Sequence, residues 1–167
     1  GYCSKAEGKS WTSLGDFCGN FNGCGHTISG LYYSGNTYGS GGLFTSIRPL
    51  SYSYADGKTF ENVIVKGELT NTNGGTGLIA GNAYYTTFRN VGVEGSVTGG
   101  SRVGAVCGIG YGPILEACYS RANVTGVTQQ YQGGPGGLVG TCETGNIYES
   151  SAFIACYVTG TMNATGQ

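Results

Sequence analysis

The sequence predicts an all-β fold, a β-solenoid (β-helix) in which a single coil of strands makes about four to five rungs. Three observations predict it: a glycine-flanked apolar motif recurs along the chain, a strand-like run ending in threonine recurs between its copies, and 34 of the 167 residues are glycine. A repeat of about 30 residues made of short β segments and turns is typical of solenoids. Glycine recurs too densely for helices, and no long segment has a 3.6-residue period.

The glycine-flanked motif supplies one strand of each rung. Its copies are 41–44 (GGLF), 77–81 (GLIAG), 104–108 (GAVCG) and 136–140 (GGLVG). The apolar residues in the middle favour a buried strand, and the flanking glycines can adopt the positive φ values that tight turns require. We therefore expect each copy to be a short buried strand between two turns.

The threonine-ending run supplies the second strand. In its first copy Val63, Val65 and Leu69 alternate with outward positions that include Lys66 and Glu68. A period of two with one charged face is typical of a half-buried strand. The copies span 60–70, 88–98, 115–125 and, more loosely, 151–159, and they end at Thr70, Thr98, Thr125 and Thr159, which lie 28, 27 and 34 residues apart.

Copies that are in phase should stack one rung apart, at about 4.8 Å, so that equivalent side chains form ladders along the coil. The expected interior ladders are Val63–Val91–Cys118 and Val65–Val93–Ser120, and the expected exterior ladder is Glu68–Ser96–Asn123. Asn123 should therefore point outward. It begins one sequon and Asn163 begins another, so both asparagines are candidates for N-glycosylation.

The two ends of the coil are expected to differ from its middle. Residues 1–20 should form an N-terminal cap or arm, and residues 21–167 the repeat region, within a single domain. No glycine motif follows Thr159, so we expect the last rung to stop half-complete. Residues 157–167 contain no charged side chain that would repel an incoming strand. This predicts end-to-end self-association, with residues 1–30 of one chain on the last rung of another.

Composition disfavours several partners. Only 10% of the residues are charged, the net charge is −1 and no basic run occurs, so the electrostatic footprint of a nucleic-acid-binding protein is missing. No apolar stretch approaches the length of a membrane span. The chain begins with Gly1 rather than Met, which favours a processed mature protein or a fragment.

Seven cysteines in a chain of this size favour disulfides and an oxidising, extracellular environment, with buried reduced thiols as the alternative. Metal binding is disfavoured, because no C-x2-C pair occurs and the chain has one histidine. We expect Cys18 to pair with Cys24, and Cys107 to pair with Cys142, about one rung away. The remaining candidates for disulfides are Cys118 and Cys156, and Cys3 is the candidate for a bond between chains.

We expect no catalytic residue and no cofactor. His26 is the only histidine, and a catalytic base would also need a nucleophile and an orienting acid. Glu68 and Glu94 are near-neighbours on adjacent rungs, but they lie offset on the solvent face, so the pair is a weak signal for a glycosidase. Tyrosines near the glycine motifs and inserts could stack on sugars or fill protein interfaces, with local packing as the alternative. They are Tyr32, Tyr33, Tyr52, Tyr54, Tyr84, Tyr85, Tyr111 and Tyr131.

Residues 21–32 (FNGCGHTISGLY) resemble the opening phrase of the β-helical surface proteins that carry GLUG repeats. The motif at 136–140 and the segment 114–126 also resemble that repeat, and the resemblance covers residues 17–162. It implies a β-helical, secreted or cell-surface, adhesin-like protein, and it supplies no active-site residue that can be assigned to this chain. The chain departs from the pattern at two cysteines. Cys24 lies where asparagine is usual, and Cys107 lies inside the glycine-flanked motif 104–108.

The sequence therefore predicts a non-enzymatic extracellular structural protein, a β-solenoid subunit that stacks head to tail into a surface filament or stalk. The alternative is a monomeric adhesin module that binds carbohydrate or a host surface protein. A polysaccharide-cleaving enzyme is a third possibility, which would need a cluster of carboxylates in one groove.

Overall fold

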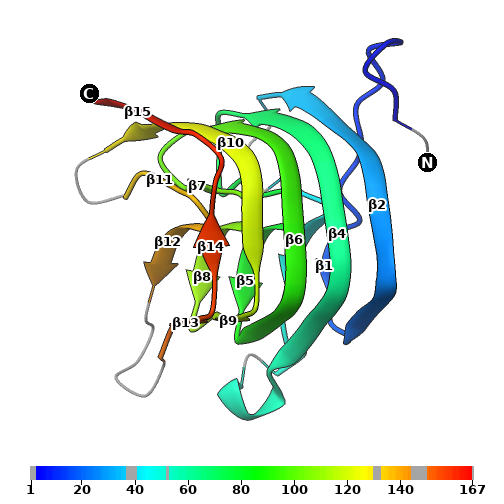
Figure 1. The fold of residues 1–167 in the computed structure, drawn as a ribbon, viewed down its shortest axis with the longest axis vertical. Coiled ribbons are helices and arrows are strands. Elements are labelled where there is room, and N and C mark those ends of the chain that lie inside the picture. Colours follow the sequence, from blue (N-terminus) through cyan, green and yellow to red (C-terminus); the bar gives the residue numbers. More distant parts are fainter. Residues whose placement is uncertain (1–2, 37–40, 52, 130–132, 144–149, 167) are drawn as a thin grey trace.

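The computed structural model describes residues 3–36, 41–51, 53–129, 133–143 and 150–166, and these residues form an all-β structure (Figure 1). Every pairing between its strands is parallel. The only helical element in the described part is a short 3-10 turn at Tyr54–Asp56. The predicted all-β class is therefore confirmed.

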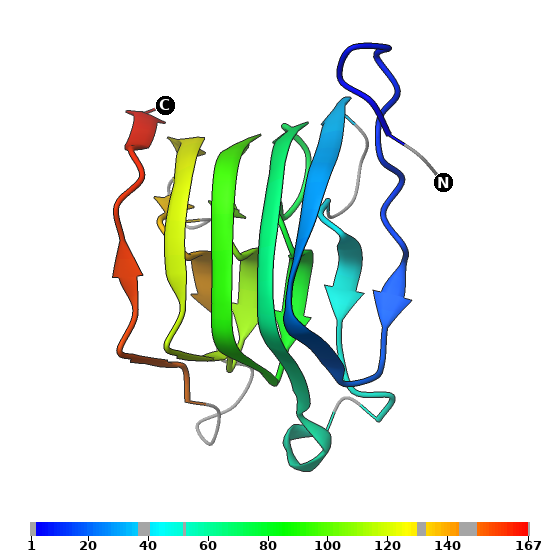
Figure 2. The ribbon, with the colours of Figure 1, turned by 45° about the vertical axis from the view of Figure 1, so that its right-hand side comes forward.

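Two sheets face each other, and the chain alternates between them (Figure 2). The long-strand sheet contains β2 (Phe21–Gly35), β4 (Lys58–Asn71), β6 (Thr86–Gly99), β9 (Ile114–Glu116), β10 (Tyr119–Thr128), β13 (Ala152–Ile154), β14 (Tyr157–Val158) and β15 (Met162–Gly166). The short-strand sheet contains β1 (Asp16–Phe17), β3 (Phe44–Ile47), β5 (Ala80–Tyr84), β8 (Cys107–Tyr111) and β12 (Val139–Glu143). A small third sheet pairs β7 (Val103–Gly104) with β11 (Pro135–Gly136). We call each stretch of chain that crosses the long-strand sheet once a pass.

The strand registers agree with the predicted ladders over three passes. Val63 pairs with Val91, and Val65 with Val93, which in turn pairs with Ser120. All of these residues are buried, and so is Cys118, the predicted end of the first interior ladder. On the outer side Glu68 pairs with Ser96 and Ser96 with Asn123, as predicted. The apolar periodicity therefore set both the inward face and the register of β4, β6 and β10.

The core lies between the two sheets and contains a column of aromatic rings. Phe60 and Phe88 are fully buried, with ring centroids 6.1 Å apart, and Phe21 stacks on Phe60 at 4.6 Å. Phe44 of the short-strand sheet meets Phe60 edge-on at 6.2 Å and so joins the two sheets. The glycine motifs supply the opposite wall, because Leu78, Ile79, Val106 and Leu138 are also buried. The predicted burial of these motifs is confirmed. The prediction that their middle residues form the strand is wrong, because these residues lie at the bend before it and β5, β8 and β12 begin at Ala80, Cys107 and Val139.

Each pass has one non-glycine residue in the left-handed backbone region, which is Cys24 in the first pass. Asn62 and Asn90 have φ values of 55° and 51°, and the same bend continues at Ala117 and Ala155, with φ values of 51° and 52°. Asparagine tolerates this conformation and alanine does not favour it. The amide of Asn90 donates to Oδ1 of Asn62 at 2.9 Å, and the amide of Asn62 donates to Oδ1 of Asn22 at 3.3 Å. An asparagine ladder therefore supports the first three passes and is replaced by alanine in the last two.

The last pass differs from the prediction. Ala152 pairs with Ile114 and Met162 with Val124, an offset of 38 residues in both cases. Thr125 therefore pairs with Asn163. The sequence pattern predicted Thr159, four residues earlier, as its partner. The pass continues beyond Thr159, because β15 pairs with β10. The chain between β10 and β13 is longer than in the preceding repeats, and the threonine used as the marker is not kept.

The N-terminal arm, residues 3–14, lies along β2 and beside Leu43, which precedes β3. The backbone amide of Trp11 donates to the carbonyl of Tyr32 at 2.6 Å, and the amide of Leu14 donates to the carbonyl of Leu43 at 3.0 Å. The Cys3 thiol donates to the carbonyl of Gly30 at 3.1 Å. These contacts cover the part of β2 from Gly30 onward.

Candidate functional site

Two surfaces stand out on the described part of the molecule. The first, which we call the outer groove, is a hollow of about 520 Å³ between the N-terminal arm and the outer face of β2, β4 and β6. The second, which we call the terminal edge, is the exposed side of residues 152–166, formed by β13, β14 and β15. Four charged side chains line the groove and none lies on the edge, so the two surfaces suit different partners.

The floor of the outer groove is backbone rather than side chain. Gly67 pairs with Gly95, and both line the groove with Gly30. Gly95 has a φ of +120°, and a Cβ placed there would lie 2.0 Å from the carbonyl oxygen of Gly67. A side chain at this position would therefore clash with the neighbouring strand as well as strain the backbone. Glycine keeps the strands close together and leaves the floor open.

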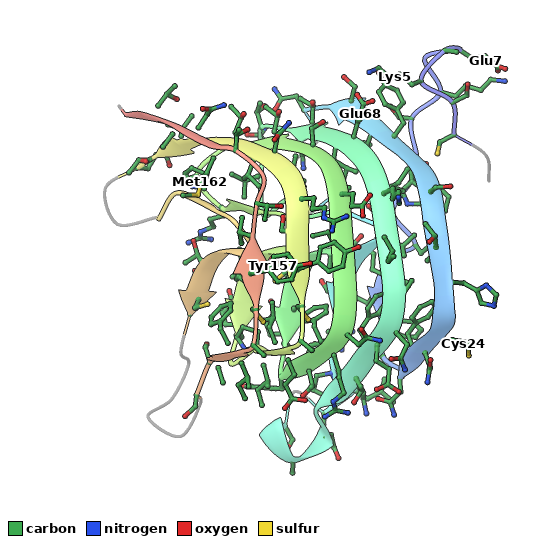
Figure 3. The ribbon with its side chains drawn as sticks, viewed as in Figure 1. Lys5, Glu7, Cys24, Glu68, Tyr157 and Met162 are labelled. Atoms are coloured by element: carbon green, nitrogen blue, oxygen red, sulfur yellow. The ribbon has the colours of Figure 1, made fainter. Side chains whose placement is uncertain are left out.

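Two lysine–glutamate ion pairs line the groove. Lys5 of the arm pairs with Glu68 of β4, and Figure 3 shows the two side chains meeting at the top of the molecule. Lys66 pairs with Glu94 of β6 at 2.7 Å. The hydrogen bond from Lys66 is the largest of the effects that hold the pKa of Glu94 below its usual value. Each ion pair joins one positive and one negative side chain, so the two pairs add no net charge to the groove.

Aromatic and cationic side chains extend the polar surface beyond the groove. The Tyr119 hydroxyl donates to Glu94 at 3.0 Å, and the Arg121 guanidinium lies 5.1 Å from the centre of the Tyr119 ring. Tyr119 stacks on Tyr157 with ring centroids 5.5 Å apart. Gly92 makes room for this stack, because a Cβ there would lie 2.4 Å from the Tyr119 ring. Burial raises the pKa of the Tyr119 hydroxyl, with the hydrogen bond to Glu94 as the next cause.

Several residues singled out in the sequence occupy these surfaces. Glu68 and Glu94 both line the groove, as does Tyr32. Each carboxylate faces a lysine, and the pair is offset across two passes, as predicted. Asn123 is exposed on the outer face, where its Oδ1 accepts a hydrogen bond from the amide of Thr161 at 3.1 Å. The predicted outward orientation of Asn123 is confirmed, and its glycosylation, like that of Asn163, stays a prediction.

Other singled-out residues lie elsewhere. His26 is exposed on β2. Tyr84 and Tyr111 stack on each other at 4.4 Å in the short-strand sheet, which supports the local-packing alternative for that pair. Tyr52 and Tyr131 lie outside the described residues.

Sequence reasoning missed four side chains that shape the site. Lys66 and Arg121 occupy the outward column that contains Glu94, so in-phase alignment of the copies was the signal that could have found them. The same alignment would have placed Tyr119 beside Gly92. Lys5 has no comparable signal, because its position depends on the path of the arm.

All seven cysteines are free thiols in the structure. In the strand register Cys142 pairs with Gly110 and Cys107 with Val139. A disulfide between Cys107 and Cys142 stays a prediction. Cys24 is exposed and points away from the body of the molecule (Figure 3). Cys18 is half-buried, and its pairing with Cys24 stays a prediction, as does a bond between chains through Cys3.

Cys118 and Cys156 are the two thiols that the registers bring together. Each precedes a tyrosine of the pair Tyr119 and Tyr157, so the two cysteines occupy equivalent positions on adjacent passes. The Cys118 thiol donates to the carbonyl of Phe88 at 3.3 Å, and the Cys156 thiol donates to that of Leu115 at 3.4 Å. Burial raises the pKa of Cys118 to about 11, so this thiol is protonated at neutral pH.

The described residues contain no group of three or more histidine, cysteine, aspartate or glutamate side chains that could hold a metal ion. They also contain no helix long and apolar enough to cross a membrane.

The terminal edge exposes the large apolar side chains of the last pass. Five of them are between 43% and 56% exposed: Phe153, Ile154, Tyr157, Val158 and Met162. Figure 3 shows Tyr157 and Met162 on the outermost strands of the sheet. No residue between 152 and 166 is charged. Natural edge strands usually carry charge or are covered, so an edge of this kind favours pairing with another strand.

Comparisons of the chain with protein-family models, with curated proteins and with solved structures find no match. The resemblance to GLUG-repeat proteins stays a prediction.

Proposed function

We propose that this chain is a non-enzymatic, extracellular structural protein: a β-solenoid subunit of five rungs that stacks head to tail into a surface filament or stalk. The observation that carries the proposal is the terminal edge, which exposes five large apolar side chains and no charge. The partner that we propose for this edge is the first pass of a second copy. A head-to-tail contact joins two unlike ends and therefore repeats into a filament.

The first pass offers residues that match the terminal edge in register. Phe21 begins the column that runs through Phe60, Phe88 and Leu115 to Phe153. A second copy in the same register would place its Phe21 on Phe153, as Phe21 already stacks on Phe60 within one chain. Such a joint would continue the aromatic column across the contact and cover the exposed ring.

A second interior column matches in the same way. It begins at Ile28, runs through Val65, Val93 and Ser120, and ends at Val158. Ile28 is half-buried and packs against the core, and Val158 is 43% exposed. The proposed joint would bury both side chains against each other.

The charges on the outer face support the same arrangement. In one column Glu61 pairs with Arg89 at 3.6 Å, and Arg89 with Glu116 at 2.7 Å. This column ends in uncharged residues, Asn22 in the first pass and Ile154 in the last. Opposite charges therefore fix the register of the middle passes, and the two end passes carry none that would oppose stacking.

The arm leaves the matching part of β2 accessible. Among the described residues, β2 pairs only with β4, and the arm contacts it from Gly30 onward. Residues 21–28 face the partner positions of β13 and β14, which carry four of the five exposed apolar side chains. Met162 on β15 would instead meet the arm. The partner surface is thus narrower than the sequence-based expectation of residues 1–30.

The alternative function is a monomeric adhesin module that binds carbohydrate or a host surface protein. The outer groove favours this alternative, because it opens on the outer face of β2, β4 and β6 and includes none of residues 21–28 or 152–166, which form the proposed joint. The two functions differ in one measurable property, which is whether the purified chain assembles.

Sedimentation of the wild type and the Val158→Lys variant tests the proposal. We expect the wild type to form particles whose size grows with protein concentration. The variant should remain a monomer, because a charge at the joint would be buried without a partner. Thermal unfolding of the variant should show that the chain still folds.

Ser96→Lys is the matched control, because it adds the same charge to the outer face of a middle pass, away from both ends. It should assemble like the wild type. Asn163→Lys adds charge to the terminal edge at an exposed outward position, so it tests the joint without changing an interior side chain. A wild type that stays monomeric at high concentration would overturn the filament proposal and favour the adhesin module.

A further inference from the structure

The outer groove has a shape suited to a ligand that lies flat against the sheet. Its volume of about 520 Å³ is within the range of small-molecule sites, roughly 300 to 1,000 Å³. A Cβ placed on Gly30 would have no atom within 4 Å, so the space above this glycine is open. With Gly67 and Gly95 beside it, the floor is a strip of backbone that crosses three passes without a side chain in the way.

The walls of the groove carry both hydrogen-bond donors and hydrogen-bond acceptors, and their charges sum to zero. Lys5 and Lys66 can only donate hydrogen bonds, and Glu68 and Glu94 can only accept them when ionised. The ion pairs place one donor beside one acceptor on two neighbouring passes. Tyr32 adds an aromatic ring, which can pack against an apolar surface of a ligand.

We propose that the outer groove binds a neutral oligosaccharide. Each sugar hydroxyl donates and accepts hydrogen bonds, so it can use a lysine and a glutamate at once, and the apolar face of a pyranose ring can stack on Tyr32. An anionic chain would face Glu68 and Glu94, and a cationic chain would face Lys5 and Lys66. An apolar ligand would bury all four charged groups without replacing their contacts with water.

The surface beyond the groove favours a chain of sugars over a single one. The outward column that contains Tyr32 and Glu68 continues with Ser96, Asn123 and Thr161. These last three residues are uncharged and can form hydrogen bonds. A linear ligand that starts in the groove can therefore follow this column across the sheet. The proposal does not depend on head-to-tail assembly, because the groove is complete within one chain.

Calorimetric titration of the wild-type chain with cellotetraose and with chitotetraose, both neutral, tests the proposal. Tetragalacturonate, an anionic chain of the same length, is the comparison. We expect at least one neutral tetrasaccharide to bind more tightly than tetragalacturonate. Tyr32→Ala should weaken that binding about threefold to tenfold, the range expected for loss of one stacked ring.

Tyr157→Ala is the matched control, because it removes a half-exposed tyrosine of the same face outside the groove. It should leave the affinity unchanged. Amide NMR spectra of the Val158→Lys variant should locate the binding, with the largest shifts at Gly30, Gly67 and Gly95. No binding of either neutral chain, equal binding of tetragalacturonate, or shifts centred elsewhere would overturn the proposal. Because the groove lies within one chain, a failure of assembly would not affect these measurements.

Discussion

At the scale of single residues, the bend in each pass shows how a local conformation selects its side chain. Asn62 and Asn90 adopt positive φ values and link their amides into a ladder, whereas Ala117 and Ala155 adopt the same conformation without that bond. A non-glycine residue held in this region costs about 1 to 3 kcal/mol, and asparagine is among the residues that tolerate it best. The two alanines are therefore the weakest members of the column.

We expect Ala117→Asn to stabilise the protein by about 1 kcal/mol, because it relieves backbone strain and can extend the ladder to Asn90. Denaturant unfolding measures the change. Ala117→Gly relieves the same strain without offering an amide, so it serves as the control. If the asparagine variant were no more stable than the glycine variant, the ladder would contribute nothing at this position.

At the scale of strands, the phenylalanine column separates folding from assembly. Phe88 is fully buried between the two sheets, whereas Phe153 is 48% exposed at the terminal edge, although the two rings belong to one column. The same substitution at the two positions should therefore affect different properties.

We expect Phe88→Ala to destabilise the folded chain by about 3 to 5 kcal/mol, the usual cost of removing a buried phenylalanine ring. Phe153→Ala should cost less than about 1 kcal/mol, because an exposed ring has little burial to lose. The same change at Phe153 should weaken assembly strongly. Unfolding curves and sedimentation of both variants measure the two effects, and intact assembly of Phe153→Ala would argue against the proposed joint.

The strands also show where the sequence was informative. β4, β6 and β10 follow copies that repeat at 28 and 27 residues, so alternation of apolar and polar residues was enough to predict their faces and register. The last pass was placed four residues out, because its repeat is 38 residues long and has Asn163 in place of the marker threonine. The strand register predicts the positions of Lys66, Glu68 and Glu94 in the groove. It does not predict the position of Lys5, because the arm has no repeat that indicates which strand it lies against.

At the scale of the whole molecule, the proposed filament has a repeat that can be calculated. Five passes separate Phe21 from the Phe21 of the next copy, and strands stack at about 4.8 Å, so each subunit should advance the filament by about 24 Å. Electron micrographs of assembled protein should show both spacings. A filament without the 4.8 Å spacing, or with an advance far from 24 Å, would mean that the copies meet by some other surface.

The position of the outer groove on the side of the sheet has a consequence for binding strength. In a filament, the same groove would recur about every 24 Å along the axis. Successive grooves would lie on one side of the filament or be rotated by a constant angle from one subunit to the next. A polysaccharide held at one groove would then meet the next at a high effective concentration, so weak individual contacts would combine into strong avidity. A surface fibre built from such subunits could hold a glycan-coated surface firmly while each single contact still forms and breaks rapidly.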